Sequence, residues 1–309
     1  MTNHTIHIKN LDVTYKNILP FKDSFTALKN INLTLEEGRI YGLLGRNGAG
    51  KTTLLSVLAS FIHPTKGTLT IDGHNILDNS AYMKDVLFIY QRSFVLEKNT
   101  NSPKVKHYIK EETQFRPNFD ADYAQHLLKL FNIPQNKRMS KLSKGMQSMV
   151  GIVIGLASRC PITIFGEAYL GMDAPSRDLF YKEILKAQEQ FPRTMIFSTH
   201  LISEMEYLFD DIIIIDKGQV IQADTYEQTV TSGVVITGVS SAVDIFTAEK
   251  KTIGIQRLGN VKKALLYHTL TDKDLQQCDV LGLEVTYTSL QDLFIRLTDA
   301  TREEYDDEM

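Results

Sequence analysis

Apolar positions in the first two-thirds of the chain fall into two patterns. Residues 5–15 and 27–38 alternate apolar and polar side chains, which predicts strands with one exposed face. Five later runs are almost wholly apolar, as is typical of strands buried in a parallel sheet. These runs are residues 40–44, 86–90, 162–165, 194–198 and 211–216. Helix-like segments separate several of them, so the order predicts an α/β core with a mixed sheet in three layers.

A more polar segment interrupts this alternation. From residue 103 to residue 138 the pattern becomes helical. We expect this stretch to form the main part of a helical subdomain at about residues 92–158, which would stand as a separate lobe beside the sheet.

Composition changes again near Thr225. From there the elements read strand, helix, strand, strand, helix, strand, which is the βαββαβ order of a small ferredoxin-like α+β domain. A final helix over residues 289–302 places its apolar side chains on one face, and an acidic tail follows it. We therefore predict two domains, residues 1–224 and 225–309, and we expect the second to be an accessory or dimerisation domain.

The charge and cysteine content of the chain exclude several classes of function. The 309 residues carry a net charge of −3, so no overall basic field would attract nucleic acid, and none is expected as a partner. Cys160 and Cys278 have no metal-like spacing, which fits a reducing compartment. The apolar stretch at residues 150–165 is interrupted by Arg159 and Pro161 and is too short to span a bilayer. We expect a cytoplasmic protein that reaches a membrane only through a partner.

Residues 45–52 match the phosphate-binding pattern G-x-x-x-x-G-K-[ST] in full, between a strand-like run and a helix-like run. In such a P-loop, backbone N–H groups approach a polyphosphate and the positive end of the helix favours its charge. Lys51 would reach the β- and γ-phosphates, and the Thr52 hydroxyl would hold Mg²⁺. The expected nucleotide contacts are Gly45, Asn47, Gly48, Ala49, Gly50, Lys51, Thr52 and Thr53. The sequence therefore predicts a site for a nucleoside triphosphate.

Further polar residues follow buried strands or precede helices. Gln91, Glu167 and His200 each come directly or almost directly after an apolar strand. Taken singly, a glutamine there is usually a solvated turn residue, and a lone histidine is more often a cap or a core group. Ser143 precedes an apolar helix, where it would serve as an N-cap or help to form an anion site.

In this order, the motifs resemble those of the nucleotide-binding subunit of ABC transporters over roughly residues 5–224. Gln91 matches the Q-loop, residues 142–146 match the L-S-G-G-Q motif, residues 170–173 match the D-loop and His200 matches the switch histidine. The resemblance implies that ATP is the nucleotide and that Glu167 polarises the attacking water.

The resemblance also implies roles for residues that face a second subunit or the adenine base. Ser143 and Gly145 would contact the γ-phosphate held by the opposite subunit, and Asp173 would lie at the dimer interface. Gln91 would contact Mg²⁺ or the attacking water, with Thr52 as the other magnesium ligand. Tyr15 matches the aromatic residue that stacks on adenine, although Phe21 and Phe25 are alternatives.

Two motifs depart from the family pattern. Lys144 and Met146 replace a glycine and the glutamine of L-S-G-G-Q. Gly166 stands where the family has the Walker B aspartate, so it offers no carboxylate to Mg²⁺. We expect this change to impair ATP hydrolysis more than ATP binding.

The resemblance implies a peripheral ATPase on the inner face of the cell membrane that works with an integral membrane permease and a second ATPase subunit, identical or different. The appended domain and the Ala168-Tyr169 pair favour a branch that exports peptides or amphipathic compounds. Two alternatives remain open. One is an ATP-binding regulatory subunit that hydrolyses little, which Gly166 suggests, and the other is a non-transport ATP switch acting on ribosomes or DNA.

Overall fold

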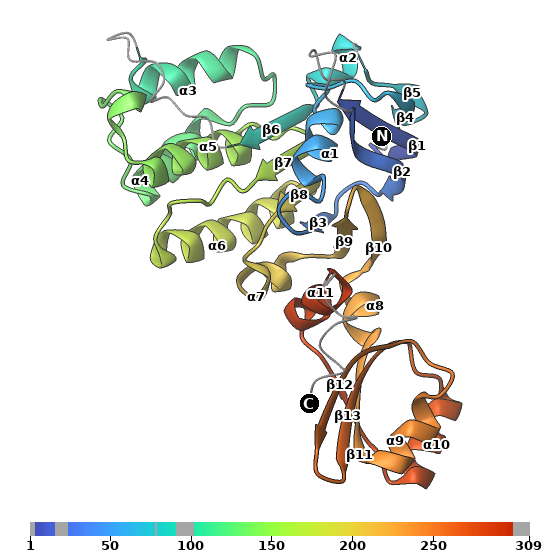
Figure 1. Cartoon of the computed structure of the whole chain (residues 1–309). Helices are drawn as coiled ribbons and strands as arrows, with labels where there is room; N and C mark the ends of the chain where they lie inside the picture. Colours follow the sequence, from blue (N-terminus) through green and yellow to red (C-terminus); the bar gives the residue numbers. More distant parts are fainter. Residues whose placement is uncertain (1–3, 16–23, 78, 91–101, 299–309) are drawn as a thin grey trace.

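The computed structural model describes residues 4–15, 24–77, 79–90 and 102–298. Three sheets organise these residues, two in the larger N-terminal part and one in the C-terminal part (Figure 1). The predicted α/β core and the small α+β domain after it are confirmed.

The central sheet has six strands in the order β10-β9-β3-β8-β7-β6. All neighbours from β9 to β6 are parallel, and β10 pairs antiparallel with β9. The strands are β3 (Ile40–Leu44), β6 (Val86–Tyr90), β7 (Ile162–Gly166), β8 (Thr194–Ser198), β9 (Asp211–Asp216) and β10 (Gln219–Thr225). One prediction from the sequence is wrong. The apolar run at residues 86–90 predicts a fully buried strand, but β6 lies at the edge of the sheet and its Tyr90 is exposed.

A second sheet packs over one face of the central sheet. It is antiparallel, in the order β2-β1-β4-β5, and apolar residues at alternate positions of β1 and β2 face inward. These strands are β1 (Ile6–Tyr15), β2 (Phe25–Leu35), β4 (Lys66–Ile71) and β5 (His74–Asn75). Helix α1 (Lys51–Leu58) lies in the same apolar cluster, with Leu54 and Leu55 fully buried.

Helices cover the other face of the central sheet and extend into a lobe (Figure 1). Among its described residues the lobe contains three α-helices and a 3-10 helix, which agrees with the predicted helical pattern after residue 103. The further helices of the larger part are α3 (Val105–Gln114), α4 (Ala121–Leu130), η1 (Met139–Lys141), α5 (Lys144–Ala157), α6 (Ala174–Gln190), α7 (Ile202–Met205) and η2 (Glu206–Leu208), together with the short α2 (Ser80–Met83) near β4 and β5.

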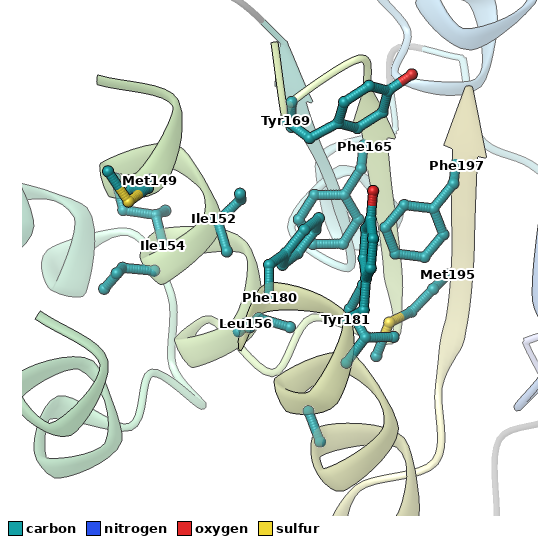
Figure 2. Packing of buried hydrophobic residues seen from close by; sticks show 14 of the residues in the cluster. Met149, Ile152, Ile154, Leu156, Phe165, Tyr169, Phe180, Tyr181, Met195 and Phe197 are labelled. Carbon is teal, nitrogen blue, oxygen red and sulfur yellow. The ribbon is translucent and has the colours of Figure 1, made fainter. Parts of the chain in front are cut away.

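Aromatic side chains join the helices to the sheet on this face (Figure 2). The rings of Phe165 on β7 and Phe197 on β8 are stacked, with centroids 4.8 Å apart, and Phe180 of α6 meets Phe165 edge-on at 5.8 Å. All three rings are fully buried, so they fix the two neighbouring strands and α6 relative to one another.

The C-terminal part has its own small core. Its antiparallel sheet has the order β12-β13-β11-β14, and α9 and α10 cover one face, as the predicted ferredoxin-like order requires. The elements are β11 (Gly233–Val239), α9 (Ser240–Thr247), β12 (Thr252–Leu258), β13 (Val261–Tyr267), α10 (Asp272–Leu281) and β14 (Glu284–Tyr287). Two more helices, α8 (Tyr226–Thr231) and α11 (Leu290–Thr298), lie at the junction with the larger part (Figure 1).

The sequence analysis missed α8. Its start carries a capping box in which the Thr225 hydroxyl accepts the Gln228 backbone N–H, while the Gln228 side chain accepts the Thr225 N–H. This T-x-x-Q spacing is a recognisable start signal for a helix, so the helix was predictable.

Candidate nucleotide site

The P-loop connects the end of β3 to the first turn of α1. Its path depends on glycine at two positions. A Cβ at Gly45 would lie 2.6 Å from the Ile215 carbonyl oxygen, and Gly50 has φ +108°, in the region that favours glycine. Since α1 begins at Lys51, the N–H groups of its first turn have no partners within the helix and face the loop. This arrangement fits a bound polyphosphate.

Lys51 is only 8% exposed, and its ammonium lies against the loop. Its Nζ donates to the carbonyl oxygens of Gly45, at 2.6 Å, and Arg46, at 3.2 Å. Burial lowers the pKa of Lys51, and the negative charge of Glu167 partly opposes this shift. The lysine therefore lies within electrostatic reach of the predicted catalytic carboxylate.

Tyr15, the predicted adenine-stacking residue, lies at the end of β1 beside the first turn of α1. Its hydroxyl and that of Thr53 are 3.2 Å apart, and the ring is 42% exposed. Phe25, an alternative, pairs with Tyr15 across the two strands and is also exposed. The other alternative, Phe21, lies outside the described residues. The structure thus brings Tyr15 and Phe25 to the edge of the P-loop helix.

Glu167 and His200 meet where two parallel strands end. Gly166 on β7 pairs with Ser198 on β8, and the Glu167 N–H donates to the Ser198 carbonyl at 3.2 Å. The His200 Nδ1 atom lies 3.5 Å from Oε1 of Glu167. Glu167 has φ +52°, a left-handed conformation that is strained for a non-glycine residue.

Tyr169 supports this pair, and the sequence analysis did not assign it a role in the site. Its hydroxyl donates to Thr199 Oγ1 at 2.8 Å and accepts the His200 backbone N–H at 3.2 Å. Burial raises the pKa of Tyr169 to about 12, so the hydroxyl keeps its proton at neutral pH. Figure 2 shows the Tyr169 hydroxyl pointing away from the aromatic core formed by Phe165 and Phe197. No spacing in the sequence indicates this contact, because it depends on the strand register.

The space beside Gly166 is occupied by an aromatic ring. A Cβ built on Gly166 would lie 2.7 Å from Cε2 and 3.2 Å from Cζ of Phe88 on β6. Phe88 in turn packs against Phe61 and Tyr90, with ring centroids 5.8 and 5.3 Å away. A carboxylate at position 166 therefore requires Phe88 to move.

The described residues fit a magnesium ion less well than they fit a polyphosphate. Of the two predicted ligands, Thr52 is exposed in the first turn of α1, and Gln91 lies outside the described residues. Position 166 supplies no donor, and the ring of Phe88 fills its surroundings. In the described part of the site, Glu167 supplies a carboxylate close to position 166. Binding of Mg²⁺ therefore remains a prediction.

Ser143 and Gly145 lie at the start of α5, against the loop between β7 and α6, and not at the P-loop of the same chain. Ser143 is the N-cap, because its Oγ accepts the Met146 N–H at 3.2 Å. A Cβ at Gly145 would come within 2.1 Å of the Gly171 carbonyl oxygen. Asp173 caps α6, because its carboxylate accepts the Ser176 N–H at 2.9 Å. Hydrogen bonding from the side chain and backbone of Ser176 lowers the pKa of Asp173. One copy of the chain thus assembles the P-loop, Tyr15, Glu167 and His200, but not these three residues.

The fold and this site define a P-loop nucleotide-binding protein. A sequence profile described as ABC transporter matches residues 28–169. NatA, an ABC transporter ATP-binding protein of Bacillus subtilis, is 31% identical over 211 residues, which are 65% of this chain and 82% of NatA. FbpC of Brucella melitensis, an Fe(3+) ions import ATP-binding protein, is 31% identical over 221 residues, 70% of this chain and 62% of FbpC.

Solved structures share the fold. An ATP-binding cassette, determined as a dimer in a post-hydrolysis state with ADP and Pi, has a TM-score of 0.61 at 22% identity and covers 72% of this chain and 98% of its own. A bacterial Atm1-family ABC exporter with ATP bound has a TM-score of 0.60 at 19% identity, covering 74% of this chain and 40% of its own. The chain belongs to the family of ATP-binding subunits that energise ABC transporters.

These relatives include an importer subunit, and one of the similar structures is an exporter, so they assign no direction of transport. Among the residues that the structure describes, none forms a helix long and apolar enough to cross a bilayer.

Proposed function

We propose that the chain binds ATP in its P-loop and hydrolyses it with Glu167 as the residue that orients and polarises the attacking water. The meeting of Glu167 and His200 at the end of β7 and β8, within electrostatic reach of Lys51, carries this proposal. A carboxylate at such a position can accept a proton as the water attacks, and the histidine beside it can sense the γ-phosphate. Tyr169 holds the backbone at His200 and so fixes its position.

We further propose that two copies, or this chain and a related subunit, enclose ATP between them. Ser143 and Gly145 support this proposal because the resemblance assigns them to the motif that contacts the γ-phosphate, yet they lie against the loop between β7 and α6 and not at the P-loop of their own chain. A helix start such as that of α5 suits an anion brought by a partner. Closure around ATP would then act on a membrane permease, since ATP favours the closed state by differential affinity.

The test of the dimer uses Glu167→Gln, which removes the negative charge and keeps the shape. In the presence of ATP this variant should elute from a sizing column at twice the mass of the subunit. The same variant without nucleotide should elute as the single subunit. A variant that binds ATP, no longer hydrolyses it and yet stays monomeric at all protein concentrations contradicts a sandwich of two identical copies, and the same experiment with the partner ATPase subunit present then tests the mixed dimer.

A second candidate is a subunit that binds ATP and hydrolyses it slowly. The observation that favours it is the Phe88 ring in the space beside Gly166, where the family has a carboxylate. Equilibrium binding and steady-state hydrolysis by the purified chain, measured with and without a candidate permease, separate the two. Tight binding with negligible turnover in both conditions supports the second candidate.

We propose export of peptides or amphipathic compounds as the transport activity, on the resemblance of the Ala168-Tyr169 pair and the appended domain to that branch. The experiment is transport by the subunit and its permease in proteoliposomes that expose the ATPase outward. ATP-dependent accumulation of a labelled amphipathic peptide inside these vesicles is expected. ATP-dependent movement of cargo out of them indicates import instead.

A further inference from the structure

The last helix of the chain reaches the P-loop. Thr298, the final residue of α11, is 3% exposed, and its Oγ1 accepts a hydrogen bond from Nε of Arg46 at 3.2 Å. The same hydroxyl donates to the Phe294 carbonyl at 2.8 Å, one turn earlier in α11. The hydroxyl is thus held by its own helix while it accepts from a residue 252 positions away.

Arg46 belongs to the part of the P-loop that holds the phosphate-binding lysine. Its carbonyl oxygen accepts from Nζ of Lys51 at 3.2 Å and from the Ala49 N–H at 3.1 Å. The side chain of Arg46 therefore connects to α11, while its backbone connects to Lys51. A shift of α11 changes the position of the carbonyl that binds the lysine.

Helix α11 also packs on both parts of the molecule. Leu290 is buried in the apolar core of the larger part, and Phe294 and Leu297 pack against that core. Leu293 is fully buried and faces the C-terminal sheet. A Cβ built on Gly233, the first residue of β11, would come within 3.2 Å of the Leu293 side chain. The helix is therefore fixed to the ATP-binding part and to the C-terminal sheet at once.

The same helix contacts the region that follows His200. Residue pairs of α11 and α7 lie close together, and α7 begins at Ile202. Figure 1 shows α11 beside α7 and α8, between the C-terminal sheet and the larger part. Helix α11 thus contacts the P-loop through Thr298 and the helix that follows His200 through α7.

We propose that α11 couples the C-terminal domain to ATP binding, with Thr298 as a positioning residue that orients the P-loop through Arg46. This inference rests on the proposed binding of ATP at the P-loop. It gives the C-terminal domain a defined role, because a partner or ligand that shifts the position of this domain would change the affinity for ATP. By reciprocity, ATP binding would then shift the equilibrium between the positions of the domain by the same coupling free energy.

The test is Thr298→Val, which removes the hydroxyl and keeps the shape of the side chain. The matched control is Thr247→Val at the end of α9, where the hydroxyl makes the same kind of bond, to the Val243 carbonyl at 2.9 Å, far along the chain from the P-loop. Titration with a fluorescent ATP analogue should show affinity lowered about fivefold or more by Thr298→Val and unchanged by Thr247→Val. Thr298→Ser keeps the hydroxyl and should retain the affinity.

A double-mutant cycle with Arg46→Met distinguishes coupling from a general loss of structure. If Thr298 acts through Arg46, adding Thr298→Val to Arg46→Met has no further effect on affinity. Additive losses in the double variant, or equal losses from Thr298→Val and Thr247→Val, overturn the proposal. Lys51→Ala distinguishes failure of the proposed ATP site from failure of the proposed coupling. If Lys51→Ala leaves ATP affinity unchanged, the proposed ATP site is wrong. If Lys51→Ala abolishes binding and Thr298→Val has no effect, only the proposed coupling is wrong.

Discussion

The segments at the ends of β3 and β7 belong to the same sheet, yet they match the residue pattern of the ABC family to different degrees. After β3 the P-loop matches its pattern in full, and Lys51 is already held inside the loop by two carbonyl oxygens. After β7 the strained Glu167 is present, but Gly166 replaces the aspartate and Phe88 fills the space beside it. In the proposed function, the half of the site that would hold ATP therefore keeps the family pattern, whereas the half that would complete hydrolysis departs from it.

The strongest test of the intact half is Lys51→Ala. Removal of a buried ammonium that should contact two phosphates leaves their charge unpaired, so we expect ATP affinity to fall about 100-fold or more. Isothermal titration with ATP measures the change. Lys182→Ala, at an exposed lysine of α6, is the control and should bind like the unchanged chain. Equal ATP affinity in the Lys51 and Lys182 variants would show that the P-loop lysine does not contribute to ATP binding.

Glu167→Gln tests the altered half. We expect turnover to fall about 100-fold, because the amide cannot accept the proton of the attacking water, while ATP affinity stays within about twofold. Release of inorganic phosphate gives the rate, and Glu284→Gln on β14 serves as the control. If the unchanged chain already turns over as slowly as the Glu167 variant, the second half of the site is inactive and the slow-hydrolysis candidate is correct.

Gly166→Asp sharpens the comparison further. The sequence alone predicts that this change raises turnover, but the structure indicates that Phe88 obstructs it. We therefore expect Gly166→Asp together with Phe88→Leu to raise magnesium-dependent hydrolysis about tenfold, because leucine lacks the Cε2 and Cζ atoms that approach position 166. Gly166→Asp alone should give a smaller gain, and Phe88→Leu alone none. A full gain from the single aspartate would show that the ring moves aside freely.

The smallest effect concerns the support of His200. Tyr169→Phe removes one hydroxyl and leaves the ring in place, so we expect turnover to fall about fivefold while ATP affinity is unchanged. Tyr123→Phe serves as the control, since that half-buried hydroxyl also donates a hydrogen bond, to Glu183 at 3.0 Å. Equal turnover in both variants would show that Tyr169 has only a packing role.

Local patterns predicted the strands and the P-loop because their signals lie within a few neighbouring residues. The apolar runs that became β3, β7, β8 and β9 needed only to be recognised as buried, and the loop needed only its glycines and Lys51. The edge position of β6 was not predictable in this way, because an apolar run does not say how many neighbours a strand has.

The contacts that shape the site depend on residues far apart in the sequence. Phe88 lies beside Gly166 because β6 pairs with β7, and Tyr169 reaches His200 because β7 pairs with β8. Thr298 meets Arg46 because α11, near the end of the described chain, packs against the larger part. Periodicity and motif spacing carry no information on such pairs, so these residues could be assigned only from the structure.

The close approach of Gly145 to Gly171 has a mechanical consequence. A built Cβ at Gly145 would lie only 2.1 Å from the Gly171 oxygen, and Ser148 Oγ donates to the Leu170 carbonyl at 2.9 Å, so the start of α5 packs tightly against the loop after Glu167. In the proposed function, a displacement of the helical lobe would therefore reach the segment that carries Glu167 through this contact.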